Sequence, residues 1–295
     1  MIGGSLRAFT EADSRAAMPP GLYALWRLSL GALLTGHFVR VLPYTDELYA
    51  KGGLDLGETA FWVVFPSPLF VLDSPAFVTF WHLLGLGLSV CFALGVRRRL
   101  AALGLWFVLV SVLAKNPLVY DLTWGYTGWA LLAAALTPTG EPRWPWQAPR
   151  RAEWAMPPTL YVGACAILAI STTVSGLSKL SRPEWLDGVA ISSLLQMGVS
   201  REGPVVDALL ALPPGLAAAL SLFVLAAELL AAPLSIVWRG RMVAWTAMVL
   251  VHLGILLTVR IPELSLGMLS FHLLTMDTRW WSRAGLAAPP PSEPS

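Results

Sequence analysis

Long apolar runs recur along nearly the whole chain, and charged or proline-rich segments separate them. A run of about 20 apolar residues forms a helix long enough to cross about 30 Å of hydrocarbon. The third and fourth runs are short, and a short interfacial helix is expected at 203–212, before the Pro213–Pro214 break. The pattern predicts eight membrane-spanning helices, near residues 22–41, 76–96, 99–114, 122–137, 157–178, 213–237, 242–260 and 264–281.

The composition agrees with an integral membrane protein. Of the 295 residues, 56% are hydrophobic and only 13% are charged, and the mean hydropathy is +0.65. We therefore predict an all-α fold, a polytopic helical membrane bundle that forms one domain over residues 21–281. Residues 1–20 are expected to be a cytoplasmic N-terminal segment and 282–295 a disordered cytoplasmic tail. The first apolar run is of spanning length, which favours a retained helix over a cleaved signal.

Basic residues predict how the helices are oriented, because cytoplasmic loops are enriched in Lys and Arg. With the N-terminus inside, the predicted inner segments hold Arg7, Arg15, Arg97, Arg98, Arg99, Arg143, Arg150, Arg151, Arg239, Arg241, Arg279 and Arg283. The predicted outer segments hold fewer, namely Arg40, Lys51, Lys115, Lys179, Arg182, Arg201 and Arg260, together with acids between Asp46 and Glu263. This asymmetry predicts an even number of spans with both termini in the cytoplasm. We expect a multi-pass protein of the bacterial cytoplasmic membrane.

Two longer outer segments follow from this topology, at about 42–75 and 179–212. The first is rich in Pro, Phe and Trp. Aromatic rings suit the boundary between lipid tails and water. We therefore interpret most of these rings as interfacial residues, including Phe61, Trp62, Phe65, Trp81 and Trp185.

Several functional classes lack support in the sequence. Cys91 and Cys165 both lie inside apolar runs, which argues against a disulfide framework or a thiolate metal cluster. There is no Walker loop, dinucleotide fingerprint, paired CxxC or HExxH, and no two histidines are four residues apart. We predict no metal cofactor. The net charge of +2 is explained by the topology, so no nucleic-acid partner is expected.

Lys179 is the first candidate functional residue. It lies where a long apolar run meets its first polar residues. A lysine near hydrocarbon keeps its charge by snorkelling or by pairing, and burial lowers the pKa of such an amine towards the range of a base. The structural alternative is a snorkelling lysine at a helix end, paired with Glu184 or Asp187.

Two further candidates are polar residues within predicted spans. Glu228 lies around the middle of the sixth span, where an ionised carboxylate is costly unless it is paired or hydrated. His252 lies near the centre of the seventh span and could reach Glu228, because a tight Arg239–Arg241 turn is expected between the two spans. Hydrogen bonds between helices are the structural alternative for both residues.

Arg260 and Asp121 complete the candidate set. Arg260 is expected at the outer end of a span, where it either snorkels or binds a carboxylate or a quinone oxygen. Asp121 and the segment Lys115–Pro117 form a polar cluster in the turn between the third and fourth spans. The topology places this turn on the same side as Lys179, so an outer pocket shared by these groups is possible.

A family resemblance reaches the same residues. The segment Gly176-x-x-Lys179-Leu180, followed by Trp185-x-x-Gly188, resembles the segment that carries the proposed catalytic lysine in vitamin K-dependent gamma-glutamyl carboxylases. These belong to the horizontally transferred transmembrane (HTTM) domain family. Glu228 falls where the carboxylases have an acidic residue. His252, followed by Ser265-Leu-Gly267-Met268-Leu-Ser270, looks like their histidine and their serine-glycine-methionine helix. The resemblance covers roughly residues 20–281.

The resemblance implies a mechanism for this chain. In that family the lysine deprotonates reduced vitamin K, oxygen addition yields a strong base that removes a glutamate γ-proton, and carbon dioxide captures the carbanion. Lys179 would be the catalytic base, in a dry pocket. The implied cofactor is reduced vitamin K or menaquinol, with O2 and CO2 as co-substrates. The implied pocket residues are Trp185, Glu228, His252, Asp121 and Arg260.

The chain departs from the carboxylases in two respects, and three functions therefore compete. The stretch 121–126 lacks their histidine, and no large lumenal domain follows the last predicted helix. The first function is quinol-dependent carboxylation or epoxidation at the outer face. The second is a non-catalytic quinone-binding or accessory subunit, similar to DoxX proteins, that partners a separate redox or substrate-binding subunit. The third is maturation of an exported peptide. All three imply contact with membrane lipid, and a transporter is disfavoured because no inverted repeat is evident.

Overall fold

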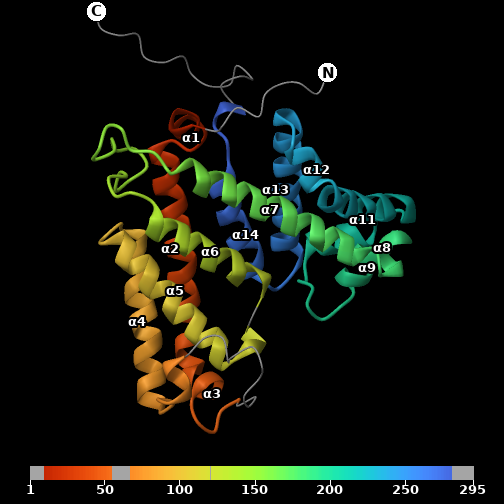
Figure 1. The fold of residues 1–295 in the computed structure, drawn as a ribbon. Helices are drawn as coiled ribbons and strands as arrows, with labels where there is room; N and C mark the ends of the chain where they lie inside the picture. Colours follow the sequence, from red (N-terminus) through yellow and green to blue (C-terminus); the bar gives the residue numbers. More distant parts are fainter. Residues whose placement is uncertain (1–9, 55–66, 120, 281–295) are drawn as a thin grey trace, which may run out of the picture.

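The computed structural model describes residues 10–54, 67–119 and 121–280 and shows a helical protein (Figure 1). Within these ranges every regular element is a helix, and the one β-type pairing is an isolated bridge between Ser200 and Val259. The all-α fold predicted from the apolar runs is therefore confirmed for the described part of the chain.

The long helices lie where the apolar runs predict them. They are α2 (Pro20–Val41), α4 (Pro75–Ala93), α5 (Arg98–Lys115), α6 (Leu122–Leu136), α7 (Pro158–Lys179), α11 (Pro214–Leu229), α13 (Trp238–Thr258) and α14 (Pro262–Thr275). Five of them, α2, α4, α7, α11 and α14, begin with a proline, whose fixed φ and missing N–H suit the first helical position. Proline therefore marks most of the boundaries that the sequence reveals.

Short helices connect the long ones. They are α1 (Glu11–Ala17), α3 (Thr45–Tyr49), α8 (Pro183–Leu186), α9 (Ala190–Leu195), α10 (Pro204–Leu210) and α12 (Ala231–Ser235), with 3₁₀ turns at Leu42–Tyr44, Pro68–Phe70 and Pro117–Val119. Helix α10 confirms the short helix expected at 203–212. The rings expected at 61, 62 and 65 and the tail at 282–295 lie outside the described residues.

Two predicted boundaries in the C-terminal half are wrong. The span predicted at 213–237 breaks after Leu229, and α12 begins at Ala231. Pro233 explains the break, because it has no N–H to donate four residues back and its ring crowds the preceding turn. The turn predicted at Arg239–Arg241 is instead the first turn of α13.

Only some of the helices meet the length and apolarity that a membrane crossing needs. Among the described residues, α4, α7 and α13 do so, and α10 with α11 adds a fourth crossing if this pair, bent by 109°, is counted as one span. Helices α6, α11 and α14 have 15, 16 and 14 residues, fewer than the roughly 20 of a straight crossing. The structure is compatible with a multi-pass membrane protein of three or four apolar spans, and eight crossings stay a prediction.

The helices form two groups joined by α14. In one group, α4 packs against α2 and α5, and α5 packs against α6. In the other, α11 packs against α7, α8, α9 and α13. Helix α14 contacts α2, α6, α7 and α13, and Figure 1 shows it between α4 and α5 on one side and α8, α9 and α11 on the other. The main core lies among α2, α4, α5, α6, α7 and α14 and includes Trp26, Leu105, Leu131, Tyr161 and Phe271.

Polar contacts sort the connecting segments into two sets. In the first set, Arg15 donates to the Glu153 carbonyl, and the Thr278 hydroxyl donates to the Ala16 carbonyl at 2.6 Å. These contacts bring the N-terminal helix α1 next to the chain that follows α14. In the second set, Arg40 pairs with Glu263, Lys115 with Asp73 and Arg260 with Glu202. Among the described residues, no salt bridge joins a predicted inner segment to a predicted outer one.

Candidate functional site

Lys179 is the last residue of α7 and is part of an ion pair. Its Nζ lies 2.6 Å from Glu228 Oε2, and it also donates to Ser175 Oγ at 2.9 Å. The ammonium sits 5.1 Å from the centre of the Trp185 ring, a distance at which a cation is attracted to the ring face. The lysine thus has a carboxylate, a hydroxyl and an aromatic ring as neighbours.

Gly176 explains why this pair forms. A Cβ at position 176 would lie 2.8 Å from the Leu229 backbone nitrogen and 3.0 Å from Glu228 Cβ. Only a glycine lets α7 and α11 approach this closely without displacing either backbone. The close approach places Glu228 beside Lys179, which follows three residues after Gly176 and therefore lies on the same side of α7.

Gly188 has a similar role in placing Trp185. It has a φ of +75°, in the left-handed region that favours glycine, and an added Cβ would lie 2.7 Å from Ala218 Cβ on α11. The turn after α8 therefore packs directly onto α11, and Trp185 on α8 reaches the ammonium. The spacing Gly176, Lys179, Trp185, Gly188 thus corresponds to one local assembly of α7, α8 and α11.

The ion pair is only partly shielded. The Lys179 side chain is 20% exposed and the Glu228 side chain 10%. Glu184 and Asp187, the partners expected for a snorkelling lysine, are exposed, and neither forms a salt bridge with Lys179. The break after Leu229 places Glu228 at the end of α11 and not, as predicted, in the middle of a continuous span. The partner of Lys179 is thus Glu228, on another helix.

His252 does not form the expected pair with Glu228. Both of its ring nitrogens are buried and have no hydrogen-bond partner within the described chain. Its ring centre lies 5.6 Å from that of His272 on α14, and it is within electrostatic range of Lys179. His252 therefore lies near the ion pair on one side and near a second histidine on the other.

Asp121 and Arg260 are engaged elsewhere. Asp121 caps α6 by accepting a hydrogen bond from the Thr123 N–H at 2.7 Å. Arg260 donates to the exposed Glu202 at 2.9 Å. The amide of Asn116, in the same turn as Asp121, donates to the Leu48 carbonyl. None of these hydrogen bonds involves the Lys179 assembly, so the shared outer pocket is not supported.

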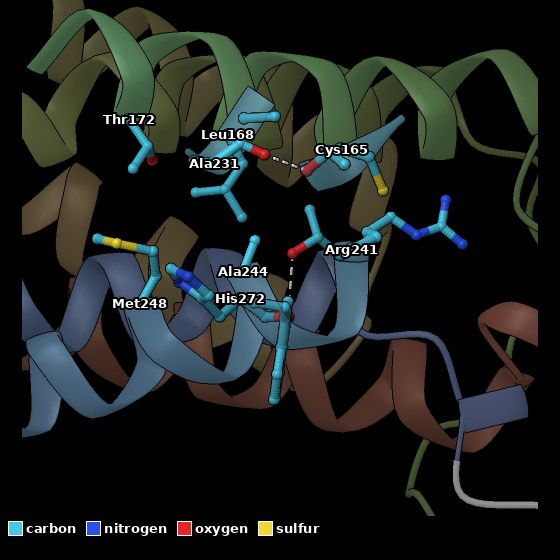
Figure 2. Close-up of a pocket in the computed structure, with 12 residues that line it drawn as sticks. Cys165, Leu168, Thr172, Ala231, Arg241, Ala244, Met248 and His272 are labelled. Atoms are coloured by element: carbon cyan, nitrogen blue, oxygen red, sulfur yellow. Dashed lines mark hydrogen bonds between the residues drawn. The ribbon is translucent and has the colours of Figure 1, made fainter. Parts of the chain in front are cut away.

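A small cavity lies between α7, α12, α13 and α14. Figure 2 shows Cys165, Leu168 and Thr172 of α7 facing Ala244 and Met248 of α13 and His272 of α14 across this space. Its volume is about 30 Å³, which is room for about one water molecule. This cavity is too small for an organic ligand, but it brings the buried His272 close to α7.

A larger cavity of about 640 Å³ lies between α2, α13 and α14. Its walls are mostly apolar, and they include the polar residues Ser29, His37, Trp245, Glu263, Ser270 and His272. Three polar atoms of these residues are buried without a hydrogen-bond partner in the described chain: His37 Nδ1, Ser270 Oγ and His272 Nε2. Neither Lys179 nor Glu228 lines this cavity. The ion pair and the cavity are separate features; His272 lines the cavity, and the ring of His252 packs against that of His272.

Another buried ion cluster, formed by Arg27, Arg98 and Glu141, was not predicted from the sequence. Arg27 lies inside the first predicted span, and its side chain is 1% exposed. It is 3.7 Å from Glu141 Oε1, whose main partner is Arg98 Nε at 2.6 Å. A charged residue within a predicted span indicates an ion-pair partner or a functional site. The position of Arg27 in the sequence could therefore have predicted this cluster.

The chemistry available at the Lys179 assembly is proton transfer. A lysine and a glutamate joined by a hydrogen bond of 2.6 Å can exchange a proton, and a histidine nitrogen without a hydrogen-bond partner, such as either nitrogen of His252, can also accept one. Across the described residues, no group of three or more His, Cys, Asp or Glu side chains could hold a metal ion. Comparison of the chain with protein-family models, with curated proteins and with solved structures finds no match.

Proposed function

We propose that this chain is a multi-pass protein of the bacterial cytoplasmic membrane that binds a quinol and takes up its proton at the Lys179–Glu228 pair. The proposal rests on the contact between His252 and His272, whose ring centres are 5.6 Å apart. His272 lines the 640 Å³ cavity, and both nitrogens of His252 and Nε2 of His272 are buried without a hydrogen-bond partner in the described chain. Buried polar groups without partners are rare and indicate a ligand or a reactive role.

The contacts between connecting segments support the proposed orientation. Helix α1 lies next to the chain that follows α14, as an even number of crossings requires. Each of these salt bridges joins either two predicted outer segments or two predicted inner segments. We infer that both termini are cytoplasmic and that the Lys179 assembly is at the outer end of α7.

The larger cavity fits a quinol headgroup. Such a ring is flat and apolar, and its two oxygens each need a hydrogen-bond partner. The cavity offers His37 Nδ1, Ser270 Oγ and His272 Nε2 without partners of their own. Its wall residues Ala32, Gly36 and Leu266 are exposed on the outside of the bundle, so a lipid-soluble ligand could enter sideways from the membrane.

The proposed task of the protein is to move the proton of the quinol hydroxyl. Lys179 first gives a proton to Glu228 Oε2 across their hydrogen bond, which leaves a neutral amine and a protonated carboxyl group. His272 then accepts the hydroxyl proton, and His252 carries it on to the Lys179 amine. The ring centres of His252 and His272 lie 5.6 Å apart in an edge-to-face arrangement, so the two imidazoles are direct neighbours.

The resemblance to the HTTM family supplies the rest of the proposed reaction. When bound, a deprotonated reduced vitamin K or menaquinol would react with O2 to give the strong base that prepares a substrate for CO2. The substrate would be an exported peptide or protein, presented at the outer face by a separate subunit. Within this chain, Lys179 and Glu228 would hold the proton, and Trp185 would keep the ammonium in place.

The test uses the full chain reconstituted in lipid nanodiscs with menaquinol. Oxygen uptake and quinol oxidation are measured for the wild type, for Lys179→Met and for Lys51→Met, a matched control on an exposed lysine. Loss of a general base lowers a rate by about 10²-fold or more, so Lys179→Met should be nearly inactive while Lys51→Met is unchanged. Equal rates for the three proteins would rule out Lys179 as the base.

A non-catalytic quinone-binding subunit is the second candidate. It is favoured by the observation that Lys179 does not line the cavity and already has a charged partner. This candidate predicts that menaquinone binds but that the isolated chain does not oxidise menaquinol. Leu266→Trp, at the mouth of the cavity, should then abolish menaquinone binding, whereas Leu250→Trp on an exposed face of α13 should not.

A further inference from the structure

A second polar cavity lies where the connection between α4 and α5 meets α2 and the segment after α6. Figure 1 shows these ends of α4 and α5 beneath the segment that joins α6 to α7. The cavity has a volume of about 290 Å³, and its lining includes one acidic residue and five arginines. These residues are Glu141 and Arg27, Arg97, Arg98, Arg99 and Arg150.

The single carboxylate is already occupied by the innermost arginine. Arg98 Nε lies 2.6 Å from Glu141 Oε1, and Arg98 Nη2 donates to the carbonyls of Thr137 and Pro138, each at 2.9 Å. Glu141 Oε1 also lies 3.7 Å from Arg27 Nη1, but its single negative charge cannot neutralise all five arginines. The cavity retains a clear excess of positive charge.

Several donors in the cavity are free to bind a ligand. Arg27 Nε is buried and has no partner in the described chain, although its Nη2 donates to the Arg143 carbonyl at 2.6 Å. Arg97 and Arg150 are exposed, and within the described residues neither side chain donates a hydrogen bond to the protein. Gly95 makes room for the Arg27 guanidinium in the wall of the cavity, because a Cβ at Gly95 would lie 1.8 Å from Arg27 Nη1.

The local backbone adds to the positive potential. Arg97 precedes α5 in the left-handed region, with a φ of +43°, and the first turn of α5 contains no acidic residue. The N-terminus of a helix already carries a partial positive charge, so Arg97, Arg98 and Arg99 add charge of the same sign. A bound anion would offset this repulsion.

We propose that this cavity binds a phosphate group, and that the phosphate belongs to the headgroup of an anionic phospholipid. Arginine binds phosphate through paired N–H donors, and basic pockets between membrane helices bind lipid headgroups. Leu100, beside the cavity, and Leu136 are exposed and apolar, which suits the acyl chains of a lipid. The site is independent of Lys179 and of the quinol.

The test compares two phosphate sources on the full chain purified in a neutral detergent. Thermal unfolding is followed during titration with short-chain phosphatidylglycerol, with phosphatidylcholine of the same chain length, and with inorganic phosphate. The variant is Arg97→Asn/Arg150→Gln, which leaves every hydrogen bond of Arg27 and Arg98 in place. The matched control is Arg182→Gln, an exposed arginine on the predicted outer side.

We expect phosphatidylglycerol to raise the unfolding temperature of the wild type and of the Arg182→Gln control at much lower concentration than phosphatidylcholine. Two lost charge-assisted contacts should weaken the binding of phosphatidylglycerol by the variant by about tenfold or more, with little change in its unfolding temperature without lipid. If inorganic phosphate binds as tightly as the lipid and the variant loses both, the phosphate site holds but the lipid assignment is overturned. Equal affinity of wild type and variant for phosphatidylglycerol overturns the site itself.

Discussion

The Arg98–Glu141 cluster and the Lys179–Glu228 pair differ in how completely the surrounding chain satisfies them. At the Arg98–Glu141 cluster, the two side chains are 1% and 6% exposed, and main-chain carbonyls fill the guanidinium donors that the carboxylate does not. At the Lys179–Glu228 pair, the side chains are 20% and 10% exposed, and a single hydroxyl and an aromatic ring complete the surroundings.

This difference separates a fixed interaction from an adjustable one. The guanidinium of Arg98 is held by several carbonyls at once, so it anchors the end of α6 to the start of α5. The ammonium of Lys179 is held by two side-chain oxygens and can lose a proton without breaking any backbone contact. The pair that we propose to be reactive thus differs from the Arg98–Glu141 cluster in its partial access to solvent and in its replaceable partners.

The largest expected effect on stability is at the Arg98–Glu141 cluster. Glu141→Gln leaves Arg27 and Arg98 buried without a counter-charge, and removing one partner of a buried ion pair costs about 3–5 kcal/mol. We expect a large drop in the unfolding temperature of the detergent-purified protein, or failure to accumulate in the membrane. Glu202→Gln, whose side chain is 94% exposed, is the control and should cost less than about 1 kcal/mol. Similar unfolding temperatures for the two variants would mean that Arg27 and Arg98 are not shielded from water at this cluster.

The next effect tests whether the Lys179 assembly depends on the closeness of α7 and α11. Gly176→Ala adds a methyl group 2.8 Å from the Leu229 nitrogen, and overpacking of this kind costs about 1–3 kcal/mol. Gly254→Ala on α13 is the matched control, because a Cβ there meets nothing within 4 Å; it should be neutral or stabilise by up to about 1 kcal/mol. Both are measured by thermal unfolding. A Gly176→Ala protein as stable as the control would show that the two helices are free to move apart.

The helices could be predicted from the sequence because their signals are local. Apolar runs and starting prolines place α2, α4, α5, α6 and α7 to within a few residues. The break after Leu229 was missed although Pro233 signals it, because the apolar run continues across the break and hides the missing hydrogen bond.

The partners within the site could not be predicted, because they depend on contacts between distant segments. Lys179 has acids five and eight residues along the chain, yet its partner is Glu228, 49 residues away. Gly176 brings that partner close, and a glycine in a helix does not by itself reveal which helix it approaches. For Lys179 the residue was predicted to matter and its partner was not. For Arg27 the charge inside a predicted span is visible in the sequence, but no role and no side of the membrane were assigned to it.

A smaller effect separates the two roles of the Lys179 pair. Lys179→Met alone should destabilise by about 1–2 kcal/mol, because it leaves the mostly buried Glu228 carboxylate without its partner. The double variant Lys179→Met/Glu228→Gln should recover most of that loss, which gives a coupling energy of about 1 kcal/mol or more in a double-mutant cycle. Quinol oxidation should not recover with it. If both stability and activity return in the double variant, the pair is structural.

The smallest effect concerns Arg260, the pocket candidate whose contacts are the most exposed. Its guanidinium pairs with Glu202, and both side chains are more than half exposed, so the attraction is weakened by water and salt. Arg260→Gln should change stability by less than about 0.5 kcal/mol and leave menaquinone binding unaltered, as measured by thermal unfolding and by quinone retention in nanodiscs. If Arg260→Gln instead weakened quinone binding, an exposed pair would be functionally coupled to the cavity. Solvent access would then no longer distinguish the reactive charges of this protein from its structural ones.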